Sequence, residues 1–224
     1  MSFIKIRKSC QLADKILFEV IGNLRRGKSE IEVAAEIRKL SRTIANGLAF
    51  PPIVAFGRNS ATPHHSPTER RLKVGDIVKI DLGVKYEGWC SDITRTFFTR
   101  EPSEFQEKIY NTVLAAQKLG IQKTTIGISG KNLDTVVRDF LTKESFGKNF
   151  IHSLGHGVGK KVHQSPKISP KSKAILKIGD VITIEPGLYF KNRFGIRIED
   201  TVLVEKDGIE ILTKFPKKLT VLEI

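Results

Sequence analysis

The chain has 224 residues, of which 40% are hydrophobic and thirteen are phenylalanine. This apolar content is enough to bury a substantial core, and it excludes an intrinsically disordered chain. No stretch approaches ~18 consecutive apolar residues, and residues 1–22 lack the apolar segment and cleavage site of a signal peptide. We therefore expect a cytoplasmic protein without membrane association, in which Cys10 and Cys90 stay reduced.

The charge balance is strongly basic, with 38 Lys and Arg against 24 Asp and Glu, or +14. Such an excess can attract nucleic acid. A nucleic-acid-binding patch normally carries aromatic side chains, however, and the longest basic cluster, residues 160–177, contains none. We interpret the charge as a solvated lysine-rich surface and do not expect nucleic acid as a partner.

The first part of the chain has the pattern of two helices. Apolar residues recur every four positions from Leu12 to Leu24, which is typical of one helix face. Ser29 and Glu32 have the spacing of a capping box and predict the start of a second helix. The proline-rich stretch 50–67 predicts an extended loop.

Residues 76–98 predict a β-hairpin that turns at Glu87-Gly88. Two further helices follow, the first capped by Ser103 and Gln106 and the second carrying an apolar stripe over 133–141. Strands are expected from about Val181 to the end.

One internal repeat stands out. Residues 72–83 align with residues 176–187 at an offset of 104, with six of twelve positions identical and four more conservative. Each copy follows a helix pair and carries an acid, Asp81 or Glu185, near its end. We interpret this as a duplicated helix–helix–strand half in an α+β fold, with two related sheets meeting face to face and each half bringing acids to the shared boundary.

Four acids are expected to converge there. With the predicted turn, Asp81 faces Thr94 and Asp92 lies one diagonal step away on the same face. We expect Glu185 and Glu199 to repeat this arrangement. Carboxylates that converge inside a sheet repel one another unless a cation lies between them, so the pattern predicts a metal site.

The histidines support this prediction. All five fall in two stretches totalling fourteen residues: His64, His65, His152, His156 and His163. The segment 152–159 is neither a zincin helix, because Ser153 replaces the required glutamate, nor a dinucleotide loop, because Lys160 replaces the third glycine. Its glycines permit close backbone approach around His156.

Four carboxylates and an imidazole exceed the needs of one ion. Bridging acids suit two ions about 3.5–4 Å apart, as in dinuclear hydrolases. An oxygen-rich set favours Mn, Co or Fe over a thiolate-type zinc site.

Five motifs carry a family resemblance: Asp81-Leu-Gly, Ser91-Asp92-Ile-Thr-Arg-Thr, His152-Ser-Leu-Gly-His156-Gly-Val-Gly followed by Val162-His163, Glu185-Pro-Gly, and Arg197-Ile-Glu199-Asp-Thr. Together they resemble the pita-bread metallopeptidases, which include methionine aminopeptidases, aminopeptidase P, prolidase and creatinase. The resemblance covers nearly the whole chain. It implies the pita-bread fold, with a curved antiparallel sheet and pseudo-twofold symmetry. The segments 50–57 and 63–67 look closest to Xaa-Pro peptidases.

The resemblance also implies roles for individual residues. Two divalent metal ions (Mn, Co, Fe or Zn) would be held by Asp81, Asp92, His156, Glu185 and Glu199. Glu185 would also carry the proton of the attacking water, His64 would lie near the scissile amide, and His163 would stabilise the tetrahedral intermediate. His152 matches a further histidine of the Xaa-Pro branch. Arg197 shares a strand face with Glu199, so we expect it to pair with a ligand carboxylate. His65 is interpreted as a bystander.

The main hypothesis is therefore a dinuclear-metal exopeptidase acting on peptides whose second residue is proline. Methionine removal from nascent chains is the alternative within the same chemistry, and a non-catalytic module binding nucleic acid or protein is a third reading. We expect residues 1–224 to be a single catalytic domain without a separate N-terminal creatinase-like domain, which leaves proline specificity open. Gln164, where many relatives have an acid, leaves details of the pocket open. The oligomeric state is also open, with a homodimer among the alternatives.

Overall fold

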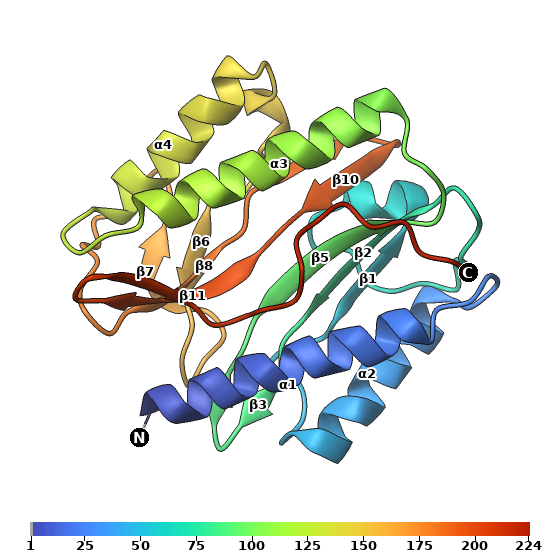
Figure 1. Ribbon diagram of the computed structural model, residues 1–224, viewed down its shortest axis with the longest axis horizontal. Coiled ribbons are helices and arrows are strands. Elements are labelled where there is room, and N and C mark those ends of the chain that lie inside the picture. Colours follow the sequence, from blue (N-terminus) through green and yellow to red (C-terminus); the bar gives the residue numbers. More distant parts are fainter. Residues whose placement is uncertain (1) are drawn as a thin grey trace.

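The computed structural model describes residues 2–224 as two helix pairs that flank the strands (Figure 1). The helices are α1 (Ser2–Gly22), α2 (Glu30–Ile44), α3 (Glu104–Lys123) and α4 (Gly130–Lys143). Within residues 2–224, no helix combines the length and the apolar character needed to cross a membrane.

Local capping sets the starts of α2 and α3, as the sequence predicts, and also the start of α4. Ser29 and Glu32 form a complete capping box at α2, and Ser103 and Gln106 form another at α3. At α4, the side chain of Ser129 accepts a hydrogen bond from the backbone of Asn132. These hydrogen bonds satisfy backbone donors that have no partner inside the helix.

The first half contains a three-stranded sheet in the order β1-β2-β5. Its strands are β1 (Ile53–Phe56), β2 (Ile77–Leu82) and β5 (Ile93–Phe98), and a small ribbon of β3 (Lys85–Tyr86) and β4 (Trp89–Cys90) extends the hairpin. Asp81 faces Thr94, which confirms the predicted register. The turn residues Glu87 and Gly88 have φ angles of 47° and 80°, the left-handed conformation of a tight hairpin turn.

Part of the prediction for residues 50–67 is wrong. This stretch holds strand β1 and the 3₁₀ helix η1 (Gly57–Ala61) rather than only an extended loop. Pro51 and Pro52 precede the strand and leave its pairing intact, so that Ile53 pairs with Asp81.

The second half contains a five-stranded sheet in the order β12-β11-β8-β6-β7. Its strands are β6 (Gly155–Gly157), β7 (Gln164–Ile168), β8 (Val181–Ile184), β11 (Asp200–Glu205) and β12 (Gly208–Ile211), with a separate ribbon of β9 (Gly187–Phe190) and β10 (Phe194–Arg197). The prediction that strands begin at Val181 missed β6 and β7. A Cβ atom on Gly155 would lie 2.0 Å from Thr183 O, and one on Gly157 would lie 2.2 Å from Ser165 O. The glycines of β6 give no apolar strand pattern in the sequence, yet they are the residues that let this strand pack between its neighbours.

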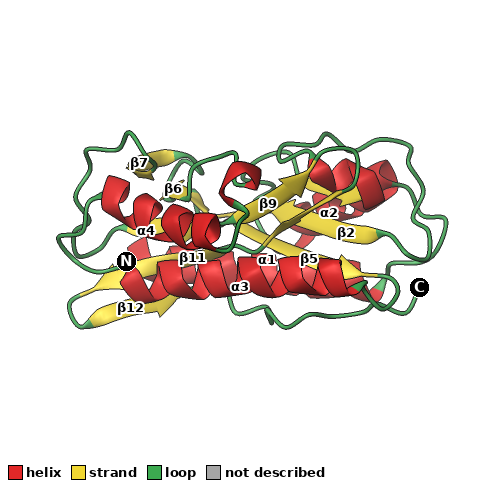
Figure 2. Cartoon of the chain, turned by 90° about the horizontal axis from the view of Figure 1, so that it is seen from above, coloured by secondary structure: helices red, strands yellow, loops and turns green. Residues whose placement is uncertain are grey.

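The two halves meet along β5 and the segment between β10 and β11. The backbone N–H of Glu199 donates to Thr94 O at 3.1 Å, and the hydroxyl of Thr96 donates to Arg197 O at 2.9 Å. The halves therefore lie edge to edge at this seam, and the expectation that the sheets meet face to face is wrong. Figure 2 shows the seam region from above, with α3 running beside it.

Each helix pair covers a separate hydrophobic core. The core under α1 and α2 includes Ile16, Val20 and Phe56, and the core under α3 and α4 includes Val113 and Val137; all five side chains are fully buried. A third, smaller apolar cluster takes side chains from both halves and joins them.

Candidate metal centre

Three potential metal ligands from distant parts of the chain meet at the seam. Asp92 precedes β5, His156 lies in β6, and Glu199 links β10 to β11. Each of the three offers one ligand atom, and these atoms lie within 4.8 Å of one another. Asp81 and Glu185 line the same cavity, whose volume is about 560 Å³. The five residues that the sequence predicts as ligands are thus brought to one place.

The two acid pairs are not arranged alike. Strands β8 and β11 pair residues whose numbers add up to 384, such as Ile184 and Asp200. On this register Glu185 lies directly opposite Glu199, whereas Asp92 is diagonal to Asp81. The expectation that the second pair repeats the arrangement of the first is therefore wrong. Thr94, and not Asp92, occupies the position that corresponds to Glu199.

The acids at this site are destabilised in their charged form. Burial, followed by repulsion from Glu199 and Asp81, raises the pKa of Asp92 well above its ordinary value. Burial and the charge of Glu185 do the same for the pKa of Glu199. Burial raises the pKa of Glu185 to about 7, although Arg197 opposes the shift. Such a cluster is the environment in which a bound cation would favour ionisation.

His156 presents a neutral imidazole to the acids. Its Nε2 atom lies 3.4 Å from Glu185 Oε1 and 3.6 Å from Asp92 Oδ2, while Nδ1 lies 3.2 Å from the carbonyl oxygen of Gly157. A carbonyl can only accept, so the proton belongs on Nδ1 and the lone pair on Nε2 points at the cluster. Burial, with a contribution from His163, lowers the pKa of His156 to about 4, so this ring is uncharged at neutral pH.

Arg197 crosses the floor of the site. Its fully buried guanidinium donates to Asp81 Oδ2, to Thr94 Oγ1 at 3.0 Å and to the Tyr189 hydroxyl at 2.8 Å. The expected pair with an acid is therefore formed with Asp81 rather than with Glu199. The other oxygen of Asp81, Oδ1, is buried and has no hydrogen-bond partner among residues 2–224. An orphaned carboxylate oxygen in an acid cluster suits a cation ligand.

Tyr189 is a site residue that the sequence reasoning missed. Its hydroxyl accepts from Arg197, so its own proton is directed to His152 Nε2 at 2.9 Å. His152 Nδ1 faces the carbonyl of Ser153 at 2.8 Å, and burial lowers the pKa of His152 to about 3. The signal in the sequence is weak: Tyr189 is the single polar side chain of strand β9.

Of the remaining histidines, two line the cavity and His65 contacts Glu30 instead. His64 and His163 line the cavity, and the ring of His163 lies 4.2 Å from that of His156 between centroids. Burial, followed by the charge of Arg197, lowers the pKa of His64. His65 is not among the residues that line the cavity, and its Nε2 lies 2.8 Å from Glu30 Oε2.

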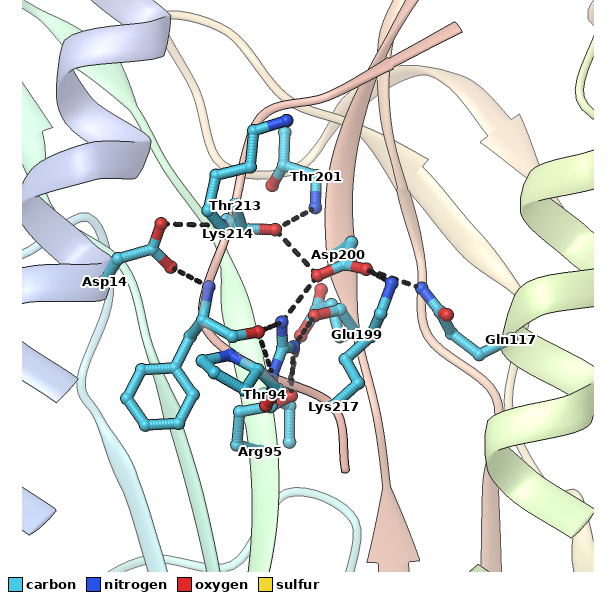
Figure 3. Close-up of polar contacts among 12 residues, drawn as sticks. Asp14, Thr94, Arg95, Gln117, Glu199, Asp200, Thr201, Thr213, Lys214 and Lys217 are labelled. Carbon is cyan, nitrogen blue, oxygen red and sulfur yellow. Dashed lines mark hydrogen bonds and ion pairs between the residues drawn. The ribbon is translucent and has the colours of Figure 1, made fainter. Parts of the chain in front are cut away.

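Behind Glu199, a buried polar network fixes the backbone of the seam (Figure 3). The carboxylate of Glu199 accepts from Thr94 Oγ1 at 2.6 Å on the cavity side. The next residue, Asp200, points the opposite way and accepts from Arg95 Nη2 at 2.7 Å and Gln117 Nε2 at 2.9 Å. Thr213 and Lys217 of the C-terminal segment also donate to Asp200. Strand alternation alone places Asp200 behind the site, but its partners come from tertiary structure.

Comparison with known proteins identifies the family. Residues 4–206 match the model of metallopeptidase family M24. An Xaa-Pro dipeptidase of Pyrococcus furiosus is 44% identical over 217 residues, which cover 96% of this chain and 62% of that protein. An Xaa-Pro dipeptidase structure from Bacillus anthracis has a TM-score of 0.96 at 39% identity, covering 99% of this chain and 62% of that one.

An X-Pro aminopeptidase structure from Thermotoga maritima has the same TM-score of 0.96 at 38% identity, covering 99% of this chain and 63% of that one. The chain spans about three fifths of the length of the relatives that it matches. The family match extends over most of the chain, and the fold agrees with the solved relatives throughout. The chain therefore belongs to metallopeptidase family M24 and has its pita-bread fold.

Proposed function

We propose that this chain is the catalytic part of a divalent-metal-dependent exopeptidase that hydrolyses the bond between an N-terminal residue and proline. The observation that carries the proposal is the convergence of Asp92, His156 and Glu199 from three segments on one cavity. The substrate class is supported by relatives named Xaa-Pro dipeptidase and X-Pro aminopeptidase.

The donor set fits two divalent ions. We assign Asp81, Asp92, His156, Glu185 and Glu199 as their ligands, because these side chains share one cavity. Three of the four acids are buried there, and Glu185 is partly buried. Four carboxylates with one imidazole are suited to Mn, Co or Fe, and Zn is also compatible with them. When bound, such ions polarise the scissile carbonyl and make water a better nucleophile.

The side chains of the chain then bind, orient and move protons. Glu185 lines the cavity, and we assign to it the transfer of a proton from the attacking water to the leaving amine. His64 and His163 line the cavity as hydrogen-bond donors for the oxygen that gains charge at the scissile carbon. The chain of hydrogen bonds from His152 through Tyr189 to Arg197 holds Asp81 in place.

The proposal includes the wider setting of the domain. We infer that residues 1–224 form one catalytic domain that acts on peptides in the cytoplasm, where the two buried cysteines, Cys10 and Cys90, stay as free thiols. A homodimer is the oligomeric state that we propose to test first, by light scattering of the purified chain.

A peptide panel tests the activity. The chain, loaded separately with Mn²⁺ and Co²⁺, is assayed on an Xaa-Pro dipeptide, an Xaa-Pro tripeptide and a Met-Ala tripeptide, with the Asp92→Ala variant as the inactive control. We expect cleavage of the Xaa-Pro peptides and loss of cleavage after chelation. Cleavage of the Met-Ala peptide alone would make methionine removal the function, and cleavage of none would overturn the proposal.

A further inference from the structure

Two buried ionisable side chains with no part in the proposed chemistry contact the loop that carries His64. This segment, residues 57–68, is called here the His64 loop; it starts with η1 and has no regular structure after Ala61. Glu30 reaches it from the first residue of α2, and Lys79 reaches it from the middle of β2. Both residues are fully buried, at 0% exposure.

Glu30 collects hydrogen-bond donors from both ends of the loop. Its Oε1 accepts from the backbone of Phe56 at 2.7 Å and from Asn59 Nδ2 at 2.9 Å. Its Oε2 accepts from the backbone and the hydroxyl of Thr68, at 2.9 and 2.7 Å, and contacts His65 Nε2 at 2.8 Å. A buried carboxylate is stable only with such a set of donors, so the ends of the loop are tied to α2.

Lys79 collects acceptors from the middle of the loop. Its ammonium group donates to Ser60 O at 2.9 Å and Thr62 O at 2.8 Å, with Pro63 O at 3.4 Å. It also lies 5.1 Å from the centre of the Tyr189 ring, within the range of a cation–π interaction. These carbonyl groups belong to residues one to four positions before His64, so their placement constrains where the chain brings His64 to the cavity.

The other half of the molecule lacks both contacts. At the position that corresponds to Lys79 in the internal repeat stands Thr183, and Gly130 follows the helix cap Ser129 as Glu30 follows Ser29. The helix–helix–strand half therefore folds without this acid and this lysine. A buried cation is also a costly way to fill a core, because an apolar side chain would serve packing alone. Both observations indicate a task that is specific to the His64 loop.

We propose that Glu30 and Lys79 are positioning residues for His64. Glu30 binds hydrogen-bond donors of the His64 loop, Lys79 binds carbonyl groups of the same loop, and together they hold His64 toward the acid cluster. The expected effect on peptide hydrolysis rests on the proposed peptidase function, whereas the expected effect on the mobility of the loop does not.

Hydrogen exchange of the folded chain tests the structural claim without any substrate. We expect Lys79→Met and Glu30→Gln to speed exchange of backbone amides in residues 57–68 by about tenfold or more, because each loses hydrogen bonds to a charged group. Amides of α3 and α4 should be unchanged. The matched controls are Lys118→Met and Glu107→Gln, two exposed residues of α3.

Thr68→Val is a milder variant, which removes one hydroxyl donor to Glu30 and is expected to fold normally. It should give a smaller increase confined to the same amides. Unchanged exchange across 57–68 in Thr68→Val and in whichever of the two stronger variants folds would overturn the proposal.

Kinetic measurements test whether Lys79 affects hydrolysis through His64. On an Xaa-Pro peptide we expect Lys79→Met to lower kcat about tenfold with manganese content unchanged, and to have almost no further effect in the His64→Ala background. Multiplicative effects of the two substitutions would show that Lys79 does not act through His64. If the unmodified chain cleaves no peptide, the proposed function fails, and the exchange measurement still decides the loop claim.

Discussion

The two halves of the molecule share an architecture but differ in chemistry. The structural residues of the repeat are kept: Asp76 accepts from the backbone of Lys73 at 3.0 Å, and Asp180 accepts from the backbone of Lys177 at 2.8 Å. The glycine before each aspartate has a positive φ, 93° at Gly75 and 89° at Gly179. Duplication therefore conserved the turn that begins each strand.

The two halves also differ at the seam. Because Asp81 and Glu185 are equivalent, their partners in the register, Thr94 and Glu199, are equivalent too. One residue further along each strand, Arg95 in the first half corresponds to Asp200 in the second, and these two form a buried ion pair 2.7 Å long across the seam. The halves are thus complementary in charge where they touch. The repeated helix–helix–strand half forms the framework, and the seam residues that differ between the halves form the site.

The largest expected effect follows from removing one acid from either half. Asp92→Ala and Glu199→Ala should each lower the rate of Xaa-Pro hydrolysis by more than about 10³-fold and reduce the metal bound per chain, because each removes an oxygen donor from the shared cluster. Circular dichroism checks folding, and elemental analysis measures the metal.

The matched control is Asp207→Ala, an exposed acid outside the cavity. Near-normal turnover in either seam variant would show that hydrolysis does not need acids from both halves.

A smaller effect is expected on stability at the back of the seam. Arg95→Met leaves the buried carboxylate of Asp200 without its main partner and should lower the free energy of unfolding by about 3–5 kcal/mol, measured by urea denaturation. Arg100→Met, at an exposed position, is the control and should change it little. A loss under about 1 kcal/mol from Arg95→Met would mean that the charge complementarity of the halves contributes little to stability.

Glu30 of α2 should make the stability of the protein depend on pH, and the second half has no acid at the corresponding position. Burial raises the pKa of Glu30, but hydrogen bonds from His65 and the backbone of Phe56 outweigh it and hold the pKa below the ordinary 4.5. A lowered folded-state pKa stabilises the protein above pH 4.5, and this stabilisation is lost as the pH falls through the folded value.

At pH 6 the chain should therefore be about 1–3 kcal/mol more stable than Glu30→Gln in urea denaturation, since the amide leaves buried donors unsatisfied. The difference should shrink below pH 4.5. A difference that stays constant down to pH 3 would show that ionised Glu30 is not the stabilising form.

The smallest effect distinguishes the two threonines that support the acids. Thr94 Oγ1 lies 2.6 Å from Glu199 Oε2, and Thr183 Oγ1 lies 3.2 Å from Glu185 Oε1. We expect Thr94→Val to weaken Mn²⁺ binding about tenfold and Thr183→Val to weaken it less, because the shorter hydrogen bond orients its carboxylate more firmly. Isothermal titration calorimetry measures both. The reverse order would contradict this account of how the acids are held.

The sequence predicts features that depend on local or periodic rules. The capping boxes, the hairpin register that places Asp81 opposite Thr94, and the repeat all follow from spacing alone. Strand β6 escaped prediction because its glycines carry no apolar signal, although they are what allows it to lie between β7 and β8.

The supporting residues of the site are harder to find. Lys79 interrupts an apolar strand and Glu30 begins an amphipathic helix, and neither pattern indicates a common loop as their target. Aligning the returning strands of the repeat would have found the charge complementarity of Arg95 and Asp200, and would have corrected the expectation for Glu199. The other contacts between segments far apart in the chain cannot be predicted from residue spacing.

Diffraction from crystals grown with Mn²⁺, measured at the manganese absorption edge, tests the central claim most directly. We expect two anomalous peaks per chain at the seam, surrounded by acids from both halves together with His156. A single peak bound by one half alone, or no peak at the seam, would contradict it.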